Sequence, residues 1–421
     1  MLSIHYIREQ PEQVRQNLAR RNDPTILTRL DEVIALDQQY RAGLQRIEQL
    51  RNQRNTISRE IAAAKAAGKD TAALLQQAAQ IPTLIKELEE KNEQIQQQLH
   101  EQLLRIPNLL DASVPQGISE DDNVAIAYFG SKPQHTFPLK SHVDLMVERG
   151  WVDLERAAKV AGSRFYYLKG DLALLDLALQ RYAVDLLLKQ GYTLMIPPFF
   201  MRKELYAGVT DLADFENVMY KIEDEDLHLI ATSEHPLVAM HADEIFEEKE
   251  LPKFYAGISP CFRKEAGSHG KDTKGIFRVH QFFKVEQVIL CKPQESAKFL
   301  ETMLSNAEAL FSSLGLYFRK VLICTGDIGT VAAKKYDLEV WMPIQGKYRE
   351  VVSGSNCTDY QARRLKIRYR TPHGTAMVHT LNCTMAATSR VLVAILENFQ
   401  QPDGTVKIPK VLVPYFGKER M

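Results

Sequence analysis

The sequence is poor in cysteine and has no long apolar segment. Its 421 residues include five cysteines, which lie far apart and form no CxxC pair of the kind that suggests a zinc site. We therefore expect reduced thiols and no zinc. There is no run of about 18 apolar residues, and the N-terminal stretch lacks the apolar centre of a signal peptide. These absences argue against a disulfide-rich secreted protein and a helical membrane protein, and they predict a cytoplasmic location.

Neither sign of charge is in excess. Lys and Arg together number 53, as do Asp and Glu, so the formal net charge is zero. Bulk electrostatics therefore do not indicate a nucleic-acid partner, and a site for one must come from local clusters. The familiar phosphate loops GxxxxGK[ST] and GxGxxG are missing from the basic segment 262–287. The length and the ordinary apolar content predict a large core and two domains.

Residues 27–106 are rich in Gln, Ala, Leu, Arg and Glu and nearly free of aromatic residues. Apolar side chains recur there at steps of three and four, and the turn AAGKDT around Gly68 divides the segment in two. We predict an antiparallel two-helix coiled coil, each helix about 60 Å long, within an N-terminal domain of residues 1–112. The expected seam of the first helix runs through Leu30, Val33, Asp37, Tyr40, Leu44, Ile47, Arg51, Arg54, Ser58 and Ile61.

The first helix of this hairpin is basic and the second is acidic. Two interpretations of this division are open. The charges either pair across the helices of a solvated coiled coil, or they form a basic face that docks on the phosphates of a nucleic acid. The arginines that would form such a face are Arg41, Arg46, Arg51, Arg54 and Arg59.

A second domain is expected over residues 113–421, where strand patterns, aromatic residues and turn residues replace the helical pattern. Two strand-like segments, 254–267 and 275–290, flank the cationic turn SHGKDTK and predict an antiparallel hairpin. Alternation along the strands would then decide which side chains share a face. The expected shared sets are Arg263 with Glu265 on the first strand, and Arg278, His280, Phe282, Lys284 and Glu286 on the second.

These side chains suit a nucleotide, because guanidinium groups grip phosphates, a ring stacks on a base and a carboxylate accepts from an amine. Surface charge pairs on an amphipathic hairpin would give the same pattern. Thr232 and Glu234 in TSEHPL could hold an ammonium group. Glu339 and Glu350 fall on opposing strands of another expected hairpin, where carboxylates beside a triphosphate commonly bind magnesium. Arg390 lies in the first turns of a helix, a place that favours anions.

Together these motifs resemble those of the seryl-tRNA synthetases, a family of class II aminoacyl-tRNA synthetases, from end to end of the chain. GYTLMIPPF, which contains Pro197, is similar to class II motif 1. FRKEAGSHGKDTKGIFRVHQFFKVE is similar to motif 2, and NCTMAATSRVLVAILEN to motif 3. The resemblance implies an α+β class II catalytic domain, with a mixed, mainly antiparallel sheet flanked by helices, preceded by the long N-terminal antiparallel two-helix coiled coil.

The resemblance also implies the roles of particular residues. The implied catalytic residues are Arg263, Arg278 and Arg390, and the implied Mg²⁺ ligands are Glu350 and Ser353. The implied ATP site consists of Arg263, Lys264, Glu265, Val279, Phe282, Glu350, Val351, Val352, Ser353 and Arg390. The implied serine site consists of Thr232, Ser233, Glu234, Arg263, Glu286, Asn382 and Thr384.

The activity that the resemblance implies is ATP-dependent activation of L-serine, followed by its transfer to the 3′ end of tRNA(Ser), with tRNA(Sec) as a second candidate. The hairpin would reach the long variable arm of the tRNA, the catalytic domain its acceptor end, and motif 1 would form a homodimer. Two alternatives remain: a paralogue that loads a non-tRNA carrier, and a non-catalytic RNA-binding scaffold. The chain departs from the family pattern in motif 3, which lacks glycines, and at Lys271 and Lys274, where arginine is frequent.

Overall fold

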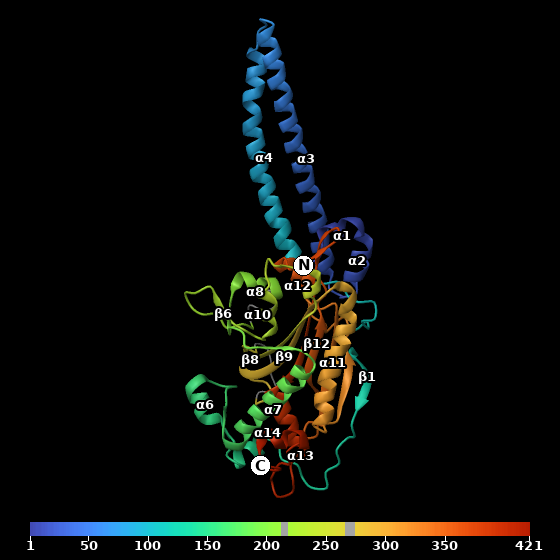
Figure 1. Ribbon diagram of the computed structural model, residues 1–421, viewed down its shortest axis with the longest axis vertical. Coiled ribbons are helices and arrows are strands. Elements are labelled where there is room, and N and C mark those ends of the chain that lie inside the picture. Colours follow the sequence, from blue (N-terminus) through green and yellow to red (C-terminus); the bar gives the residue numbers. More distant parts are fainter. Residues whose placement is uncertain (212–217, 266–273) are drawn as a thin grey trace. The chain divides into compact units, whose positions relative to one another are not determined.

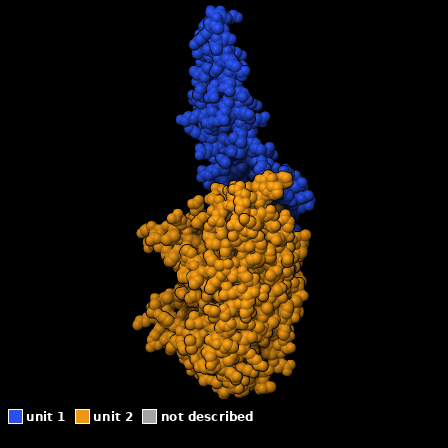
Figure 2. Space-filling view, viewed as in Figure 1, with its two compact units in different colours: residues 1–107 blue, residues 108–421 orange. Residues whose placement is uncertain are grey.

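The computed structural model describes residues 1–211, 218–265 and 274–421. Two compact units divide the chain, residues 1–107 and residues 108–421 (Figure 2). The assignment of residues 1–112 and 113–421 as separate functional domains stays a prediction.

The N-terminal unit is helical. After α1 (Ile4–Glu9) and α2 (Pro11–Ala19) come the long helices α3 (Pro24–Ala66) and α4 (Ala72–Leu104), which lie side by side as a hairpin (Figure 1). Asp23 caps α3 by accepting from the Thr25 amide. Gly68, with φ +68°, supplies the left-handed residue that ends the helix. The predicted antiparallel two-helix coiled coil is confirmed.

The predicted seam of α3 is wrong in its distal half. The buried apolar set continues from Ile47 through Leu50 and Ile57, which pack against Ile81 and Ile85 of α4. The predicted seam positions Arg51, Arg54 and Ser58 are exposed instead. A step of three residues after Ile47, rather than four, brings the apolar side chains into the interface and leaves the guanidinium groups in water. The hydrophobic effect therefore decides the register.

An eight-stranded sheet forms the centre of the second unit, and it is antiparallel except where β4 runs parallel to β8. This arrangement confirms the predicted α+β fold with a mixed, mainly antiparallel sheet. The strands, in spatial order, are β1 (Val124–Phe129), β10 (Phe318–Leu322), β11 (Lys334–Met342), β12 (Lys347–Asn356), β15 (His379–Ala387), β9 (Gln281–Cys291), β8 (Lys253–Phe262) and β4 (Thr193–Met195).

Alternation along β9 separates the two faces of this sheet. Val285 and Ile289 belong to the core that includes α7, α11 and α13, whereas Val288 and Leu290 pack with α8, α10 and α12. Glu286 shares the face of Val288 and Leu290, because side chains two residues apart in a strand point the same way. The helices are α7 (Gly170–Lys189), α8 (Lys203–Val209), α10 (Glu234–Ala239), α11 (Ser296–Ser313), α12 (Tyr360–Leu365) and α13 (Thr388–Phe399).

Shorter elements complete the second unit. They are α5 (His142–Glu148), β2 (Val152–Asp153), α6 (Leu154–Ala161), β3 (Tyr167–Leu168), β5 (Phe200–Arg202), β6 (Leu227–Leu229), β7 (Ile245–Phe246), β13 (Arg368–Thr371), β14 (Gly374–Met377) and α14 (Val413–Phe416).

Across the residues that the structure describes, none of the helices combines the length and the apolar character needed to cross a membrane.

The predicted hairpin of β8 and β9 is present, but its strands are shorter than expected. Regular pairing ends at Phe262 opposite Gln281, after which the Arg263 amide donates to the His280 carbonyl at 2.9 Å. Glu265 adopts φ +48°, a left-handed conformation that ends the strand alternation. The assumption that Arg263 and Glu265 share a strand face is therefore wrong.

Candidate active site

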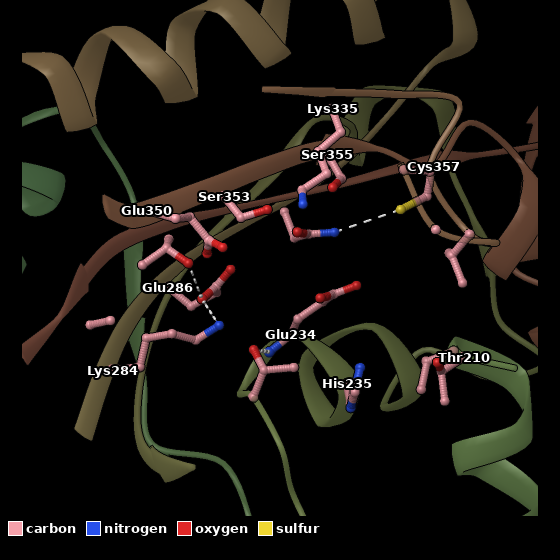
Figure 3. A pocket seen from close by; sticks show the side chains of 18 of the residues that line it. Thr210, Glu234, His235, Lys284, Glu286, Lys335, Glu350, Ser353, Ser355 and Cys357 are labelled. Atoms are coloured by element: carbon pink, nitrogen blue, oxygen red, sulfur yellow. Dashed lines mark hydrogen bonds and ion pairs between the residues drawn. The ribbon is translucent and has the colours of Figure 1, made fainter. Parts of the chain in front are cut away.

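The face of the sheet that carries Glu286 contains a cavity of about 420 Å³ (Figure 3). Strands β9, β12 and β15 form its floor, and α10, α13 and the segment 327–332 form its walls. The cavity gathers side chains from segments more than a hundred residues apart in sequence. Those of the predicted site residues that line it are Thr232, Glu234, Arg263, Phe282, Glu286, Glu350, Val351, Ser353, Asn382, Thr384 and Arg390.

One end of the cavity combines an aromatic ring with two guanidinium groups. The Arg263 guanidinium carbon lies 5.4 Å from the centre of the Phe282 ring. Arg390 lies 5.2 Å from the ring centre of the buried Phe277. Its Nη1 donates to the Glu350 carboxylate at 3.0 Å. This end offers a flat surface for stacking, with fixed positive charge beside it.

Glu350 is the carboxylate of this end of the cavity. Burial opposes its ionisation, but the positive charges of Arg390, Lys335 and Arg263 outweigh that effect and hold the pKa of Glu350 below its ordinary value. Ser353, three residues further along β12, also lines the cavity. An ionised carboxylate and a hydroxyl are oxygen donors of the kind that Mg²⁺ prefers, so this pair fits the ion.

Another part of the floor carries a buried ion pair. Glu286 on β9 lies directly across from Thr384 on β15, and the Thr384 hydroxyl donates to the Glu286 carboxylate at 3.4 Å. Lys284, which is 7% exposed, forms an ion pair with Glu286, which is 1% exposed. Burial raises the pKa of Glu286, and Lys284 acts against that rise. This part of the cavity can exchange hydrogen bonds with a small polar group.

Glu234 enters the cavity from the first turn of α10 and faces Glu286 (Figure 3). Its main-chain amide donates to the Thr232 hydroxyl at 3.2 Å, which helps to fix the turn. Burial and the nearby Glu286 raise the pKa of Glu234 to about 7. Two facing carboxylates make this corner a place for a cation that can donate several hydrogen bonds.

Six residues of the predicted sites lie outside the cavity lining. Val279 and Val352 belong to the hydrophobic core, and Ser233 is buried against Gly257. Arg278 forms an ion pair with Glu265 at 3.3 Å. The sixth residue is Lys264, whose amide donates to the Val218 carbonyl. Of the two lysines of the predicted cationic turn, Lys271 lies outside the described residues.

Other lining residues carry charge or polarity that the sequence motifs did not assign. Lys284 appeared only as one member of an expected strand face, and His235 directly follows Glu234 in TSEHPL. Lys335 is largely buried, and although burial opposes its charge, Asp337 and Glu350 hold its pKa above its ordinary value. The signal for Lys335 was its place two residues before Asp337 in the strand KKYDLEVW. Alternation along that strand puts Lys335 and Asp337 on one face, where they form an ion pair at 3.4 Å.

The hairpin of α3 and α4 is called the arm below. The five arginines predicted to form its basic face are all exposed, and they differ in their partners. Arg41 donates to the buried Asp37 at 3.0 Å, and Arg51 donates to Glu89 on α4 at 2.6 Å. Within the described residues, the Arg54 side chain makes no ion pair or hydrogen bond. Cross-helix pairing therefore accounts for part of the basic helix only. The two remaining arginines bond within α3, Arg46 to Gln49 and Arg59 to the Asn55 carbonyl.

Comparisons with known proteins agree over the whole chain. Residues 1–110 match the family described as the seryl-tRNA synthetase N-terminal domain, and residues 219–399 match the tRNA synthetase class II core domain (G, H, P, S and T). The serine–tRNA ligase of Methanocella arvoryzae is 57% identical over 418 residues, which are 99% of this chain and 98% of that protein. The serine–tRNA ligase of Pyrococcus horikoshii is 50% identical, covering 99% of this chain and 96% of that protein.

Solved structures give the same result. The crystal structure of seryl-tRNA synthetase from Pyrococcus horikoshii complexed with ATP has a TM-score of 0.97 at 49% identity, covering 100% of this chain and 99% of that chain. A cytoplasmic serine–tRNA ligase from Naegleria fowleri in complex with AMP has a TM-score of 0.92 at 38% identity, covering 100% of this chain and 98% of that chain.

Proposed function

The chain belongs to the seryl-tRNA synthetase family, and we propose that the cavity beside Phe282 is where it joins ATP to L-serine and passes serine to a tRNA. It is an enzyme, a serine–tRNA ligase that uses ATP as a substrate. The observation that carries the assignment of the site is the convergence of two arginines and an aromatic ring with two facing carboxylates in one cavity. The first set suits a nucleotide, and the second suits an amino acid's ammonium group and hydroxyl.

The nucleotide would occupy the arginine end. Adenine would stack on Phe282, Arg263 would contact the α-phosphate, and Arg390 would hold the β- and γ-phosphates. The short distance between the Arg263 guanidinium and the Phe282 ring supports this division. Arg278 and Glu265 pair with each other in the structure. We expect ATP to replace that pair, with Glu265 accepting from the adenine amine and Arg278 contacting phosphate.

Glu350 and Ser353 would hold Mg²⁺. The low pKa of Glu350 supports this role, because the ligand must be ionised. When bound, the ion would neutralise charge on the phosphates. Arg390 would keep the Glu350 side chain in place by donating to both its carboxylate and its carbonyl oxygen.

Serine would occupy the carboxylate end. Thr232 and Glu234 would take its ammonium group, while Glu286, Asn382 and Thr384 would surround its carboxylate and hydroxyl. The burial of Glu286 and its contact with Thr384 explain selection against alanine. A substrate without the hydroxyl would leave buried polar groups unpaired, which is costly. Threonine would be excluded by space alone.

The chemistry needs no protein nucleophile. A serine carboxylate oxygen attacks the α-phosphorus of ATP in line, the bond to the bridging oxygen breaks, and pyrophosphate leaves. A hydroxyl of the tRNA's terminal adenosine then attacks the carbonyl carbon of seryl-adenylate, and AMP leaves. Both steps concentrate negative charge near Arg263. Fixed guanidinium groups in a cavity stabilise that charge without reorganising, which is a main source of catalysis in such reactions.

The arm would bind the long variable arm of tRNA(Ser), and tRNA(Sec) is a second candidate. The exposure of Arg46, Arg54 and Arg59 supports this role. A homodimer would form through motif 1, where Ile196, next to Pro197, is 70% exposed. We place the enzyme in the cytoplasm, in keeping with its part in translation. The comparisons give no support to a carrier-loading paralogue or to a non-catalytic scaffold.

An aminoacylation assay tests the proposal. Purified enzyme should support serine-dependent exchange of pyrophosphate into ATP and should charge tRNA(Ser). Removal of the variable arm from the tRNA should leave the exchange intact and reduce charging strongly. Exchange without any charging of intact tRNA(Ser) would contradict the tRNA assignment, and absence of serine-dependent exchange would contradict the assignment of the cavity.

A further inference from the structure

Gln361 is a buried amide on α12 that joins three elements behind the cavity, and its side chain is 1% exposed. Its Nε2 donates to the Glu234 carboxylate at 2.9 Å and to the Val209 carbonyl at 2.9 Å. Its Oε1 accepts from the Thr380 hydroxyl at 2.5 Å. Both amide protons and the amide oxygen therefore have partners. Since the nitrogen faces two acceptors, its orientation is determined by the hydrogen-bond network.

The contact with Glu234 matters because that carboxylate lies among several charged groups. Glu286 and Lys284 face it from β9, and Arg263 faces it from the end of β8. Burial and Glu286 raise the pKa of Glu234 to about 7, while Gln361, Lys284 and Arg263 act in the opposite direction. Of the three residues that lower the pKa of Glu234, Gln361 is the one without a formal charge. Its donated hydrogen bond favours the ionised carboxylate.

Three further titratable neighbours of Glu234, namely Tyr206, His235 and Cys357, do not supply positive charge. Burial raises the pKa of the Tyr206 hydroxyl, so this group is neutral. Burial lowers the pKa of His235 to about 3, so this imidazole is neutral at physiological pH. Burial and the Glu234 charge raise the pKa of the Cys357 thiol well above its ordinary value, so it too is neutral. The hydrogen bond from Gln361 therefore restrains the position of the Glu234 carboxylate and also favours its ionised form.

We propose that Gln361 is a positioning residue for serine recognition, which holds Glu234 in the orientation and the ionised form that accept the substrate's ammonium group. This inference rests on the proposed function, in which Glu234 takes that ammonium group. Gln361 is not one of the described residues that line the cavity. It would therefore act through Glu234 and not by touching serine. A neutral amide suits the task, since a lysine or arginine here would compete with the ammonium group for the carboxylate.

The test uses the full-length enzyme with Gln361→Met, which keeps the side-chain length and removes the donor. Serine-dependent pyrophosphate exchange would be measured over a pH range from about 5.5 to about 9. We expect the KM for serine to rise about tenfold, as for loss of a hydrogen bond to a charged group, with the KM for ATP unchanged. The acidic limb of kcat/KM for serine should move to higher pH by about one unit.

Gln287→Met provides a matched control. Gln287 is also fully buried, donates to the Met303 carbonyl at 2.9 Å and accepts from Asn306 at 2.9 Å. It lies on the other face of β9, so the same substitution removes a buried amide without altering the cavity. We expect Gln287→Met to change the melting temperature but neither the KM for serine nor the pH profile.

Gln361→Glu is the second variant. It keeps an acceptor for Thr380 but replaces the donor to Glu234 by a second carboxyl group. The acidic limb should then move further than with Gln361→Met, because two adjacent carboxyl groups cannot both ionise readily. This variant carries the test if Gln361→Met does not fold.

Two results would overturn the inference. One is a folded Gln361 variant whose serine KM and acidic limb match those of the parent enzyme. The other is a Gln287→Met variant that shifts both quantities as much as Gln361→Met does. Glu234→Gln separates this inference from the function on which it rests. An unchanged serine KM in Glu234→Gln would overturn the assignment of the ammonium site itself, whereas a raised KM there with normal Gln361 variants would overturn only the role of Gln361.

Discussion

Arg390 Nη1 donates to the carboxylate and to the main-chain carbonyl oxygen of Glu350, each at 3.0 Å. The first turn of α13 is thereby tied to β12 at the edge of the cavity. The same guanidinium group also lies over the Phe277 ring, 5.2 Å from its centre. A cation held by three groups loses little freedom when an anion arrives, which is the condition for electrostatic stabilisation without reorganisation.

We expect Arg390→Ala to lower kcat for pyrophosphate exchange by about two to three orders of magnitude, as for removal of one fixed charge-stabilising donor. The measurement is steady-state exchange with saturating serine and ATP. Arg370→Ala is the control, because Arg370 forms an exposed ion pair with Glu247 at 2.8 Å outside the cavity. Equal loss of activity in the two variants would count against a specific role for Arg390.

Arg263→Ala should abolish formation of seryl-adenylate and leave the fold intact. The Arg263 side chain is partly buried at the cavity, and the hydrogen bond that it donates to the Ala231 carbonyl is long, at 3.4 Å. Exchange should fall by at least about two orders of magnitude, while circular dichroism and the melting temperature stay close to the parent. Retained exchange would contradict the placement of the α-phosphate.

Glu286→Gln should raise the KM for serine by about tenfold or more and leave the KM for ATP within about twofold. The change removes the negative partner of the buried Lys284, so we also expect a lower melting temperature. Comparison of the two Michaelis constants in the same variant corrects for any loss of active protein. A larger effect on ATP than on serine would reverse the proposed map of the cavity.

Glu234→Gln should weaken serine binding and yet stabilise the fold at alkaline pH. In the folded protein the pKa of Glu234 rises from its ordinary value of 4.5 to about 7. The folded state therefore binds the proton more tightly than the unfolded state, and this carboxyl lowers stability progressively as the pH rises from 4.5 through 7. The amide, which still accepts from Gln361, does not ionise and avoids that cost.

Denaturant unfolding at about pH 5 and about pH 8 measures this effect. The variant should exceed the parent in free energy of unfolding by up to about 3 kcal/mol at the higher pH and by much less at the lower one. If the difference in free energy of unfolding does not depend on pH, the surroundings do not raise the pKa of the Glu234 carboxyl.

Shortening the arm should separate adenylate formation from tRNA charging. Replacement of residues 46–89 by a short turn removes the exposed arginines from Arg46 onward and keeps the ion pair of Arg8 with the buried Asp37 near the base of the hairpin. We expect normal pyrophosphate exchange and a large loss of kcat/KM for tRNA(Ser). Unchanged charging would contradict the role of the arm.

A pair of single substitutions refines the same prediction. Arg54→Ala should raise the KM for tRNA and reduce the slope of log K against log salt concentration by about one. The reason is that the Arg54 guanidinium group is exposed without a partner among the described residues. Lys86→Ala removes the same charge from α4, where Lys86 lies 3.8 Å from Glu90. The lysine variant should bind tRNA as the parent does.

The sequence predicted the helical hairpin of α3 and α4 and the main strand hairpins of the sheet well, because both kinds of hairpin depend on local periodicity. Glu339 and Glu350, for example, lie opposite each other on β11 and β12 as expected. The strand faces beyond Phe262 were predicted less well. Alternation holds only while the backbone stays extended, and the left-handed Glu265 breaks it, so Glu265 and Arg278 pair outside the cavity lining.

What the sequence by itself determined is the family, the division into a helical arm and an α+β body, and the set of charged and aromatic residues available to a site. Tertiary structure decided which of them meet. The choice of Leu50 over Arg51 for the seam follows from the burial of apolar surface between two helices. The bond of Gln361 to Glu234, 127 residues apart, follows from the packing of both α12 and α10 against α8. Such contacts depend on long-range packing, which no local pattern of residues encodes.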